Sequence, residues 1–357
     1  MSTSSNRFFA GGANVVPVAL TAVAVVATSM WWWRRRRFQR ETKTDKIVVA
    51  DLVVYPIKSC AGTSVVTATP TVRGFQGDRV AQVTDANGKY CTPRDKGKEK
   101  LFHVQVKFAA AGKESSLVLT SQHMPKESAS HSIDLKNTET KPVQVEVLEA
   151  PAPLTLRDYG NATATWLAQA TGISGCRLTA MGPEFDRSVR VNPAQGEALP
   201  NNDKAPPMSL ADEAPYLLVN AASLDDLNRR LRARGKDPVD MRRFRPNIVV
   251  QGIPAWHEDT WRRIRIGPTA EFWVWQRCGR CVMTTIDRDS LQRGPEPLAT
   301  LSEFRERAKG MRNFGMHLIP CPETVGQGGV TISVHDKVEV LEYDPERQAE
   351  FLRVHGK

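Results

Sequence analysis

An uncharged apolar segment near the start divides this chain into a part suited to a bilayer and a part suited to water. No charged side chain occurs from Phe8 to Trp33, and residues 15–33 are dominated by Val, Ala and Leu. Three tryptophans end the segment, and Arg34 to Arg37 follow directly. About 20 apolar residues span a bilayer as a helix, tryptophan favours the interface, and clustered arginine stays on the cytoplasmic side. We therefore predict one transmembrane helix at residues 15–33, with the bulk of the chain in the cytosol.

Three alternatives to an anchor fit this segment less well. A signal peptide places its basic residues before a shorter apolar part, whereas the basic block here comes afterwards. A mitochondrial transit peptide is rich in arginine and amphipathic, but only Arg7 precedes the apolar segment. The third alternative is a hydrophobic tail on a soluble protein. Residues 34–45 are expected to form a basic linker to the folded part.

The composition behind this segment is that of an ordinary globular protein. The 357 residues carry a net charge of +10, which falls to +6 when the four arginines at 34–37 are subtracted. The sequence has no interleaved aromatic and basic ladder and no zinc-finger spacing, so we expect no nucleic-acid partner. Hydrophobic residues at 41% and charged residues at 25% exclude disorder along the whole length. Six cysteines are too few for a disulfide scaffold and suit a reducing compartment.

Short β-strand patterns dominate the residues after position 45. The run from Lys46 to Lys58 is rich in Val and Ile, which is typical of a buried strand. The pair Asn87-Gly88 is a hairpin signal between candidate strands at 80–84 and 89–92. The first half is therefore expected to form a small antiparallel sheet or barrel. Further candidate strands lie at 101–108, 116–120, 143–148, 247–251, 264–266 and 272–276, and a closing hairpin is expected from 330–334 and 337–341.

Three helices are expected among these strands. Asn161 caps the first and Gly172 ends it. The second runs from Ser223 to Ala233, with acidic residues in its first turn and basic residues in its last, which complements the helix dipole. A capping box of Thr300 and Glu303 opens the third, which closes at Gly310.

The proline-rich stretch 183–207 is a loop or a connection between domains. The fold is thus predicted to be mixed α+β, mainly β. Its parts are a tail at 1–14, the anchor at 15–33, the linker at 34–45, two β-rich domains at 46–182 and 183–345, and a tail at 346–357.

The most compact reactive cluster is the Cys-x-x-Cys pair formed by Cys278 and Cys281. Such a pair can be half of a zinc site, a dithiol redox pair, or one functional thiolate beside a bystander. Zinc needs a second pair, for which His317 and Cys321 are the candidates. A dithiol of the thioredoxin kind is followed by a helix, whereas residues 282–286 are expected to continue as strand.

A single thiolate flanked by Arg277 and Arg280 suits a soft transition metal. Two buried structural cysteines are the remaining alternative. The residues around the pair leave all four interpretations open.

Cationic and polar side chains also stand at the ends of several predicted strands. Lys58 and Ser59 follow the first strand, and Arg79 begins a later one. Arg245 and Asn247 open another strand in the second half. Side chains of this kind that converge from separate strands suit one anionic ligand such as a phosphate. The sequence contains no P-loop, no G-x-G-x-x-G after a strand, no H-E-x-x-H and no G-x-S-x-G, so common nucleotide, zinc-protease and serine-hydrolase sites are not expected.

Taken in order, four motifs resemble those of the MOSC proteins, a family named after the C-terminal domain of molybdenum cofactor sulfurases. They are YPIKSC, GDR, RFRPNIVV and CGRCVMTTID. Among these proteins the chain is most similar to the mitochondrial amidoxime reducing component family, whose members also carry an N-terminal anchor. The resemblance covers residues 46–343. It implies a MOSC N-terminal β-barrel domain at 46–182 and a β-rich MOSC domain at 183–345.

The resemblance also implies a molybdenum-molybdopterin cofactor (Mo-molybdopterin) between the two domains. Cys281 corresponds to the cysteine that ligates molybdenum and is the predicted catalytic residue, and Cys278 is then a bystander. Gly279 stands where the closest relatives have serine, which leaves only a backbone contact. The stretch Ala211 to Pro215 departs from the Ser/Thr-rich version that we expect of the family. The implied cofactor contacts are Lys58, Ser59, Arg79, Asp212, Glu213, Ala214, Arg245, Asn247, Gly279 and Arg280.

The activity implied by the resemblance is the reduction of N-hydroxylated substrates such as amidoximes and hydroxylamines, and also nitrite. The sequence shows no flavin, haem or iron-sulfur motif, so a partner is expected to deliver electrons. By resemblance the partners are cytochrome b5 and NADH-cytochrome b5 reductase, and the membrane is the mitochondrial outer membrane. From the resemblance we also expect pyridoxal phosphate binding. The alternatives are a MOSC module that binds the cofactor or carries sulfur on Cys281 without reductase activity, and a membrane protein whose cofactor site has decayed.

Overall fold

The computed structural model of the chain describes residues 46–109, 116–136, 140–191, 198–200, 205–308, 310–326 and 328–355. The predicted anchor at 15–33, the tail at 1–14 and the linker at 34–45 lie outside the described residues. None of the helices in the described ranges is long and apolar enough to cross a membrane.

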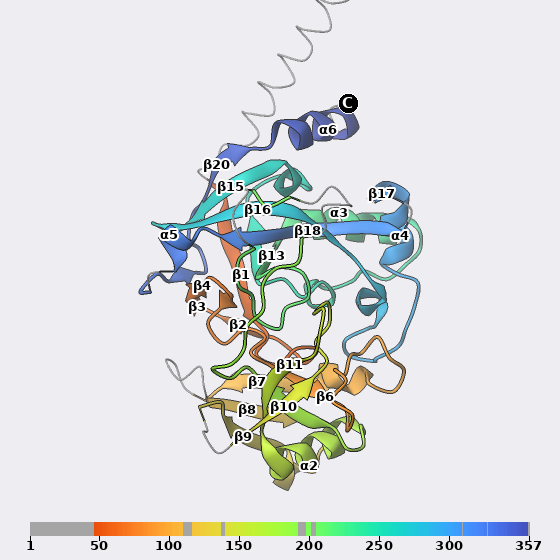
Figure 1. Ribbon diagram of the computed structural model, residues 1–357. Helices are drawn as coiled ribbons and strands as arrows, with labels where there is room; N and C mark the ends of the chain where they lie inside the picture. Colours follow the sequence, from red (N-terminus) through yellow and green to blue (C-terminus); the bar gives the residue numbers. More distant parts are fainter. Residues whose placement is uncertain are drawn as a thin grey trace, which may run out of the picture. The chain divides into compact units, whose positions relative to one another are not determined.

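A nine-stranded sheet is the largest element of the fold (Figure 1). Its strand order is β2-β1-β14-β13-β18-β16-β15-β20, and β17 pairs with β18 off this path. β13 and β14 are parallel, and the other pairs are antiparallel. The strands are β1 Val48–Val54, β2 Thr63–Val65, β13 Tyr216–Asn220, β14 Ile248–Gln251, β15 Trp261–Ile266, β16 Ala270–Gly279, β17 Glu306–Ala308, β18 Met311–Pro320 and β20 Val338–Tyr343.

The first described strand belongs to the sheet built mainly by the second half of the chain. β1 lies between β2 and β14, with Leu52 opposite Ile248. Both side chains are fully buried in the main hydrophobic core. The strand predicted at 46–58 is therefore confirmed for residues 48–54, where buried side chains alternate with half-buried ones, and its long-range partner lies in the motif RFRPNIVV.

Helix α3 (Ala221–Ala233) follows the buried strand β13 and packs on β13 and β14. Asn220 caps it, because its side chain accepts a hydrogen bond from the N–H of Ala222. Leu227 and Leu231 are buried on one face. The predicted second helix is thus confirmed, with a start two residues earlier than the predicted Ser223 because of this cap.

Two smaller sheets and helix α2 (Gly160–Thr171) surround a second core, in the lower part of Figure 1. One sheet has the order β10-β11-β12-β6 and the other β7-β8-β9, and all their pairs are antiparallel. The mainly β, mixed α+β fold is as predicted. The strands are β6 Ala81–Thr84, β7 Val104–Phe108, β8 Ser116–Ser121, β9 Ser130–Asp134, β10 Lys141–Val145, β11 Leu154–Asp158 and β12 Arg177–Ala180.

Short elements complete the described chain. The two-stranded sheets are β3 Thr67–Ala68 with β19 Ile332–Ser333, and β4 Pro70–Thr71 with β5 Gly74–Phe75. The remaining helices are α4 Leu298–Phe304, α5 Pro322–Val325 and α6 Pro345–His355, and the 3-10 helices are η2 Glu99–His103, η3 Lys126–Ser128, η5 Met241–Arg243, η6 His257–Thr260 and η7 Val282–Thr285.

Turn and helix-end signals were partly correct. The Asn-Gly turn is confirmed, because Gly88 has a φ of 79° and the N–H of Asp85 donates to the carbonyl of Lys89 at 2.8 Å. Gly172 ends α2 in the left-handed conformation, as predicted. Asn161 as its cap was wrong, since the helix already starts at Gly160 and the Asn161 side chain accepts a hydrogen bond from Arg177 instead.

Two predictions for the C-terminal part were wrong. The expected closing hairpin does not form, because β19 pairs with β3 and β20 pairs with β15. Strand pairing over such distances leaves no local sequence signal. The capping box at Thr300 is also absent, since α4 begins at Leu298 and ends at Phe304, and the N–H of Thr300 donates to Glu296.

Two shorter segments also differ from the predicted strands. Residues 99–103 form the 3-10 helix η2, and strand β7 begins only at Val104. Residues 282–285 form the 3-10 helix η7 rather than a continued strand. The expected strand after Cys281, which was the argument against a dithiol of the thioredoxin kind, is therefore absent.

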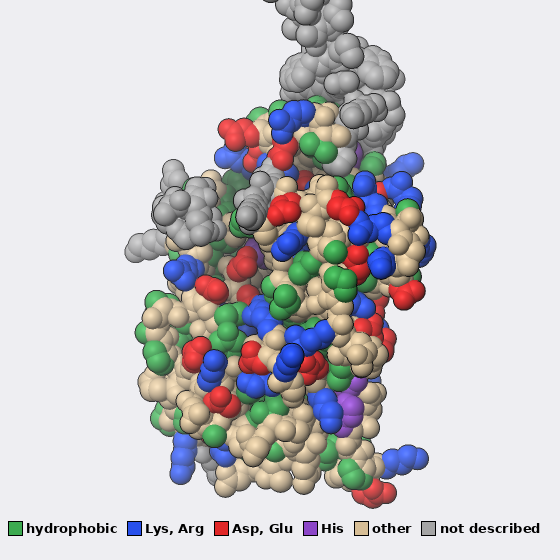
Figure 2. All heavy atoms as spheres, turned by 90° about the vertical axis from the view of Figure 1, so that its right-hand side faces the viewer, with side chains coloured by type: hydrophobic (Ala, Val, Ile, Leu, Met, Phe, Trp, Pro, Cys, Tyr) green, Lys and Arg blue, Asp and Glu red, His purple; other side chains and the backbone are tan. Residues whose placement is uncertain are grey.

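The surface carries both signs of charge. Figure 2 shows one face of the molecule, on which Lys and Arg side chains lie interspersed with Asp and Glu. This face therefore offers no wide area of a single sign.

Glu258 in η6 is a fully buried carboxyl group, and we expect it to make stability depend on pH. It receives hydrogen bonds from Ser223 Oγ at 2.6 Å and from Asn220 Nδ2 at 3.0 Å. Burial, followed by the neighbouring carboxylate of Asp259, raises the pKa of Glu258. The folded state then holds the proton more tightly than the unfolded chain, whose Glu pKa is about 4.3. The stabilisation of the folded state by this proton binding is complete below that value. It is lost as the pH rises through the pKa of Glu258 in the folded state.

The variant Glu258→Gln is expected to remove this loss, because the amide mimics the protonated acid at every pH. Urea unfolding midpoints of both proteins, measured at intervals from about pH 5 to about pH 8, test the expectation. The wild-type midpoint should fall more steeply with pH than that of the variant. Parallel profiles would show that Glu258 is not the responsible group.

Candidate functional site

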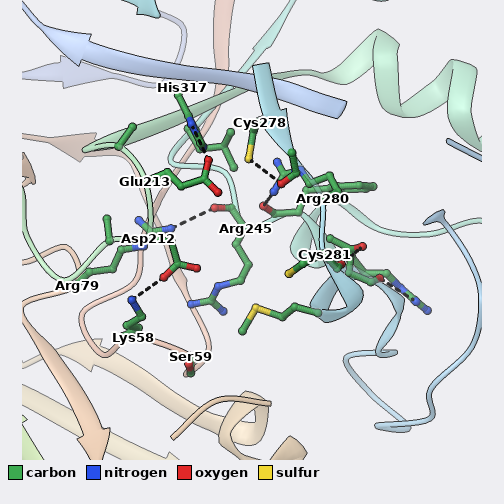
Figure 3. Close-up of a pocket in the computed structure, with 18 of the residues that line it drawn as sticks. Lys58, Ser59, Arg79, Asp212, Glu213, Arg245, Cys278, Arg280, Cys281 and His317 are labelled. Atoms are coloured by element: carbon green, nitrogen blue, oxygen red, sulfur yellow. Dashed lines mark hydrogen bonds and ion pairs between the residues drawn. The ribbon is translucent and has the colours of Figure 1, made fainter. Parts of the chain in front are cut away.

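One cavity collects all the residues that were predicted to contact the cofactor (Figure 3). Its walls come from the segments after β1 and β5, the segments before β13 and β14, and the end of β16. The proximity of these residues is observed, while their roles toward a cofactor stay predictions. The predicted residues in the wall are Lys58, Ser59, Arg79, Asp212, Glu213, Ala214, Arg245, Asn247, Gly279, Arg280 and Cys281. Arg277, which was expected to flank the thiolate, is not in this wall and pairs with Asp259 and Glu350 instead.

Hydrogen bonds to the backbone bring three of these segments together. The N–H of Tyr55 donates to Asp78 Oδ1 at 2.7 Å, and the N–H of Arg79 donates to the carbonyl of Tyr55 at 2.8 Å. The N–H of Leu210 in turn donates to the carbonyl of Arg79 at 3.0 Å. Segments far apart in the sequence thereby present their polar side chains to one cavity.

Three residues in the cavity wall have an unusual backbone conformation. Ser59, Arg79 and Arg245 have φ values of 71°, 49° and 56°, in the left-handed region that L-residues with a side chain rarely adopt. Such strain costs about 1–3 kcal/mol per residue and is concentrated at functional sites. The observation supports a functional interpretation of this cavity.

A chain of ion pairs and hydrogen bonds runs from Lys58 through Asp212 and Arg94 to Cys281, and Figure 3 shows its first contact, between Lys58 and Asp212. Lys58 Nζ lies 2.5 Å from Asp212 Oδ1 and donates to the carbonyl of Leu210 at 2.8 Å. Arg94 Nη2 lies 3.0 Å from Asp212 Oδ2, and its Nε donates to Cys281 Sγ at 3.3 Å. Burial alone would raise the pKa of Asp212, but Lys58 and Arg94 outweigh it and lower that pKa. Burial lowers the pKa of Lys58, partly offset by Asp212.

Tyr55 supports two further guanidinium groups. Arg79 and Arg245 lie over its ring, with Cζ 4.7 Å and 4.2 Å from the centroid. Arg79 also pairs with Asp78 and donates to Asn247 Oδ1 at 3.0 Å. The Asn247 amide accepts a second hydrogen bond from the N–H of Leu217 and donates to the carbonyl of Val53. Asn247 therefore ties β1, β13 and β14 together and orients Arg79.

The two cysteines of the late motif have different environments. Cys278 is buried on β16, and burial raises the pKa of its thiol to about 12. Cys281 is the exposed one of the six cysteines. Cys278 is therefore a protonated thiol at neutral pH, whereas Cys281 can offer its sulfur to a ligand. This difference favours one functional sulfur beside a bystander.

The zinc alternative finds little support. His317 lines the cavity from β18, and its Nδ1 lies 3.5 Å from Glu213 Oε2. Cys321 is buried at the start of α5 and is not part of the cavity wall. Within the described ranges, no three His, Cys, Asp or Glu side chains come together as a metal site. Cys281 would thus be a single protein ligand to a metal whose other ligands come with a cofactor.

Two arginines that matter for this geometry were not predicted. Arg94 links Asp212 to Cys281, and Arg187 donates to the backbone carbonyls of Ser209, Ala211 and Asp212 at 2.8, 2.5 and 3.3 Å. Arg187 thereby holds the segment that carries Asp212. Neither residue belongs to a recognisable motif, and one arginine among many gives no local signal of its partner.

The cavity wall suits an anionic group that carries a soft metal. Six of its side chains are Lys or Arg and two are carboxylates. Arg280 donates to the carbonyls of Phe314 and Phe244, but its Nη2 is buried without a partner. Buried donors of this kind call for an acceptor. An exposed thiol, a surplus of cations and an orphan guanidinium nitrogen are the features that a phosphate-bearing metal cofactor requires, so the residues present fit a molybdenum-pterin group.

The fold and the cavity define a MOSC-domain protein. The family description "MOSC N-terminal beta barrel domain" matches residues 46–174, and "MOSC domain" matches residues 205–339. The chain belongs to the family of MOSC-domain proteins that includes the mitochondrial amidoxime-reducing components. It is 31% identical over 344 residues to mitochondrial amidoxime-reducing component 1 of Homo sapiens, which covers 93% of this chain and 94% of the relative. The corresponding protein of Mus musculus is 32% identical over 300 residues, covering 82% and 80%.

Molybdenum cofactor sulfurases form a second group of relatives. The protein of Danio rerio is 29% identical over 282 residues, which cover 76% of this chain but 31% of the sulfurase. The chain thus spans about a third of that relative. Both groups connect the chain with molybdenum-cofactor-related function. Nothing in these matches supports the expected pyridoxal phosphate binding.

Proposed function

We propose that this chain is a molybdenum-cofactor-dependent oxidoreductase that reduces N-hydroxylated compounds such as amidoximes and hydroxylamines. The observation that carries the proposal is the convergence of the four motifs on one cavity that contains an exposed thiol among buried cations. The similarity to amidoxime-reducing components over nearly the whole chain adds support. Two electrons and two protons convert the N-hydroxyl group into N–H and water.

In this proposal the residues of the chain hold and orient the cofactor. When bound, the molybdenum cofactor supplies the redox chemistry that removes the substrate oxygen. Cys281 contributes its sulfur to the metal, which prefers soft ligands. Lys58, Arg79 and Arg245 pair with the anionic part of the cofactor. Asp212 and Arg94 keep Lys58 and Cys281 in place through the contacts at 2.5 and 3.3 Å.

The electron donors in this proposal are cytochrome b5 and NADH-cytochrome b5 reductase. The chain itself carries no flavin, haem or iron-sulfur motif. The apolar segment at 15–33 and the arginines behind it support an N-terminal anchor with the folded part in the cytosol. The mitochondrial outer membrane is proposed from the family resemblance.

The most direct test is the metal content and activity of the full chain. Protein made in a host that synthesises the molybdenum cofactor should contain about one molybdenum per chain. With cytochrome b5, its reductase and NADH, it should convert benzamidoxime into benzamidine. Metal-free protein from such a host, or loaded protein without this activity, would overturn the proposal.

A second function is favoured by the match to molybdenum cofactor sulfurases and by the exposed sulfur of Cys281. The chain would then carry sulfur on Cys281 as a persulfide without reducing a substrate. Sulfur released from the protein by cyanide, and lost in the variant Cys281→Ala, would support this function. Stoichiometric molybdenum together with amidoxime reduction would favour the first proposal.

A further inference from the structure

A second cavity of about 250 Å³ adjoins the first at Arg245 and is also lined by Tyr55. Phe102 and Gln122 line it from the first half of the chain, and Met241 and Arg288 line it from the second. Cys281 and Lys58 are not part of its wall, whereas Arg245 belongs to the walls of both cavities. None of the sequence motifs predicts this cavity.

Arg288 is the unusual residue of this second cavity. The residue is 7% exposed, and no carboxylate in the described ranges lies within ion-pair distance of it, although the more distant carboxylate of Asp240 also acts on its charge. Nη2 donates to the carbonyl of Arg243 at 3.0 Å, while Nε and Nη1 have no hydrogen-bond partner. One face of the guanidinium is covered by Phe102, with Cζ 3.5 Å from the ring centroid. A buried cation without a counter-ion destabilises a protein unless something binds it.

The groups next to Arg288 also favour the binding of an anion. Burial, followed by repulsion from Arg245, lowers the pKa of Arg288 to about 9, so the guanidinium is still charged at neutral pH. The nearby Arg245 is half-buried and donates to the carbonyl of Cys60 at 2.7 Å. The ring nitrogen Nε2 of His103 lies 2.9 Å from the carbonyl of Arg288 and fixes the backbone there. The cation is thus held rigidly at the cavity instead of turning to solvent.

The other walls restrict which anion fits. Phe102, Val53 and Met241 provide apolar surface, and Tyr55 also lines the cavity. The carboxylates of Asp51 and Asp289 also lie in the wall and would repel a doubly charged group such as phosphate. One unpaired guanidinium balances one negative charge. We propose that this cavity binds a small aromatic or aliphatic monocarboxylate, with its carboxylate on Arg288 and its apolar body on Phe102 and Met241.

Calorimetric titration of the full chain with benzoate tests the proposal, with neutral benzamide as the matched probe. Benzoate should bind, and benzamide should bind at least about tenfold more weakly because it lacks the charge. Arg288→Met keeps an unbranched apolar side chain but removes the guanidinium group, and it should weaken benzoate binding at least about tenfold. The control is Arg242→Met, which should change benzoate binding by less than about threefold. Arg242 lines the same cavity, but it already pairs with Asp240 and Asp289, and its side chain is 60% exposed.

Further measurements separate a binding role from a structural one. If Arg288 serves a ligand, Arg288→Met should unfold at the same or a higher urea concentration than the wild type, because an uncompensated buried charge has been removed. Met241→Trp fills the cavity from another wall and should also abolish benzoate binding. Lys58→Met, which alters only the first cavity, should leave it unchanged.

Each of four results would overturn the proposal. They are absence of benzoate binding to the wild type, equal binding of benzamide, full binding by Met241→Trp, and loss of binding in Lys58→Met. The first two concern the wild type, so they apply even where a variant does not fold.

Discussion

Cys281→Ala is expected to lower benzamidoxime reduction by more than about 100-fold, a larger loss than changes in residues around a metal ligand usually cause. Cys281 is the exposed cysteine, and no group of three potential metal ligands exists among the described residues that would replace it. The loss should appear in turnover measured with cytochrome b5, its reductase and NADH. Molybdenum per chain should fall in the same variant.

Cys278→Ala is the matched control, since this cysteine lies three residues away in the same motif. Its thiol is buried and protonated, so turnover should stay within about threefold, with a stability cost of about 1–2 kcal/mol for the lost volume. A thiol reagent should titrate one cysteine in native metal-free protein and six after unfolding. Complete loss of activity in both variants would instead establish a dithiol.

Lys58→Met is expected to weaken cofactor retention by about 10- to 100-fold. Charge-assisted hydrogen bonds contribute about 1.5–3 kcal/mol each, and burial prevents water from replacing the ammonium group. Lys58 is 7% exposed at the cavity wall. Its loss also leaves Asp212 with Arg94 as its remaining ionic partner, which adds negative charge where the cofactor phosphate is proposed to lie.

The measurement is molybdenum per chain after prolonged dialysis, compared between the wild type, Lys58→Met and Lys107→Met. Lys107 is an exposed lysine on β7, so its replacement should leave metal content unchanged. Urea unfolding of the metal-free proteins shows whether Lys58→Met acts on the fold instead. Wild-type metal content in Lys58→Met would remove this lysine from the cofactor site.

Local patterns predicted the elements whose signals are local. The strand at 46–58, the Asn-Gly turn and the helix ending at Ala233 depend on hydrophobic periodicity and on end-capping, both of which act within a few residues. The prediction of a closing hairpin was wrong because β19 pairs with β3 and β20 pairs with β15, and both partners lie far away in the sequence. Strand pairing is decided by tertiary packing, so neighbouring strand patterns do not ensure a hairpin.

In the candidate site, too, some residues could be predicted from the sequence and others could not. Its motif residues stand at strand ends, and the family resemblance selected them without knowledge of their positions. Arg94 and Arg187 were missed because their importance depends on partners at Asp212 and Cys281 that lie more than 20 residues away. Arg288 was missed because its distinguishing feature is that two of its buried nitrogens have no hydrogen-bond partner. A sequence pattern gives no sign of a missing partner.

By itself the sequence determined the family, the mainly β fold and the set of polar residues available to one anionic metal cofactor. Only the tertiary structure decided that Lys58, Asp212, Arg94 and Cys281 form one connected chain, that Cys278 is buried, and that two guanidinium nitrogens of Arg288 lack a partner at a second cavity. The physical reason is that charge and thiol chemistry depend on burial and on neighbours a few ångströms away. Those neighbours are brought together by long-range strand pairing and left-handed turns, which residue order alone does not specify.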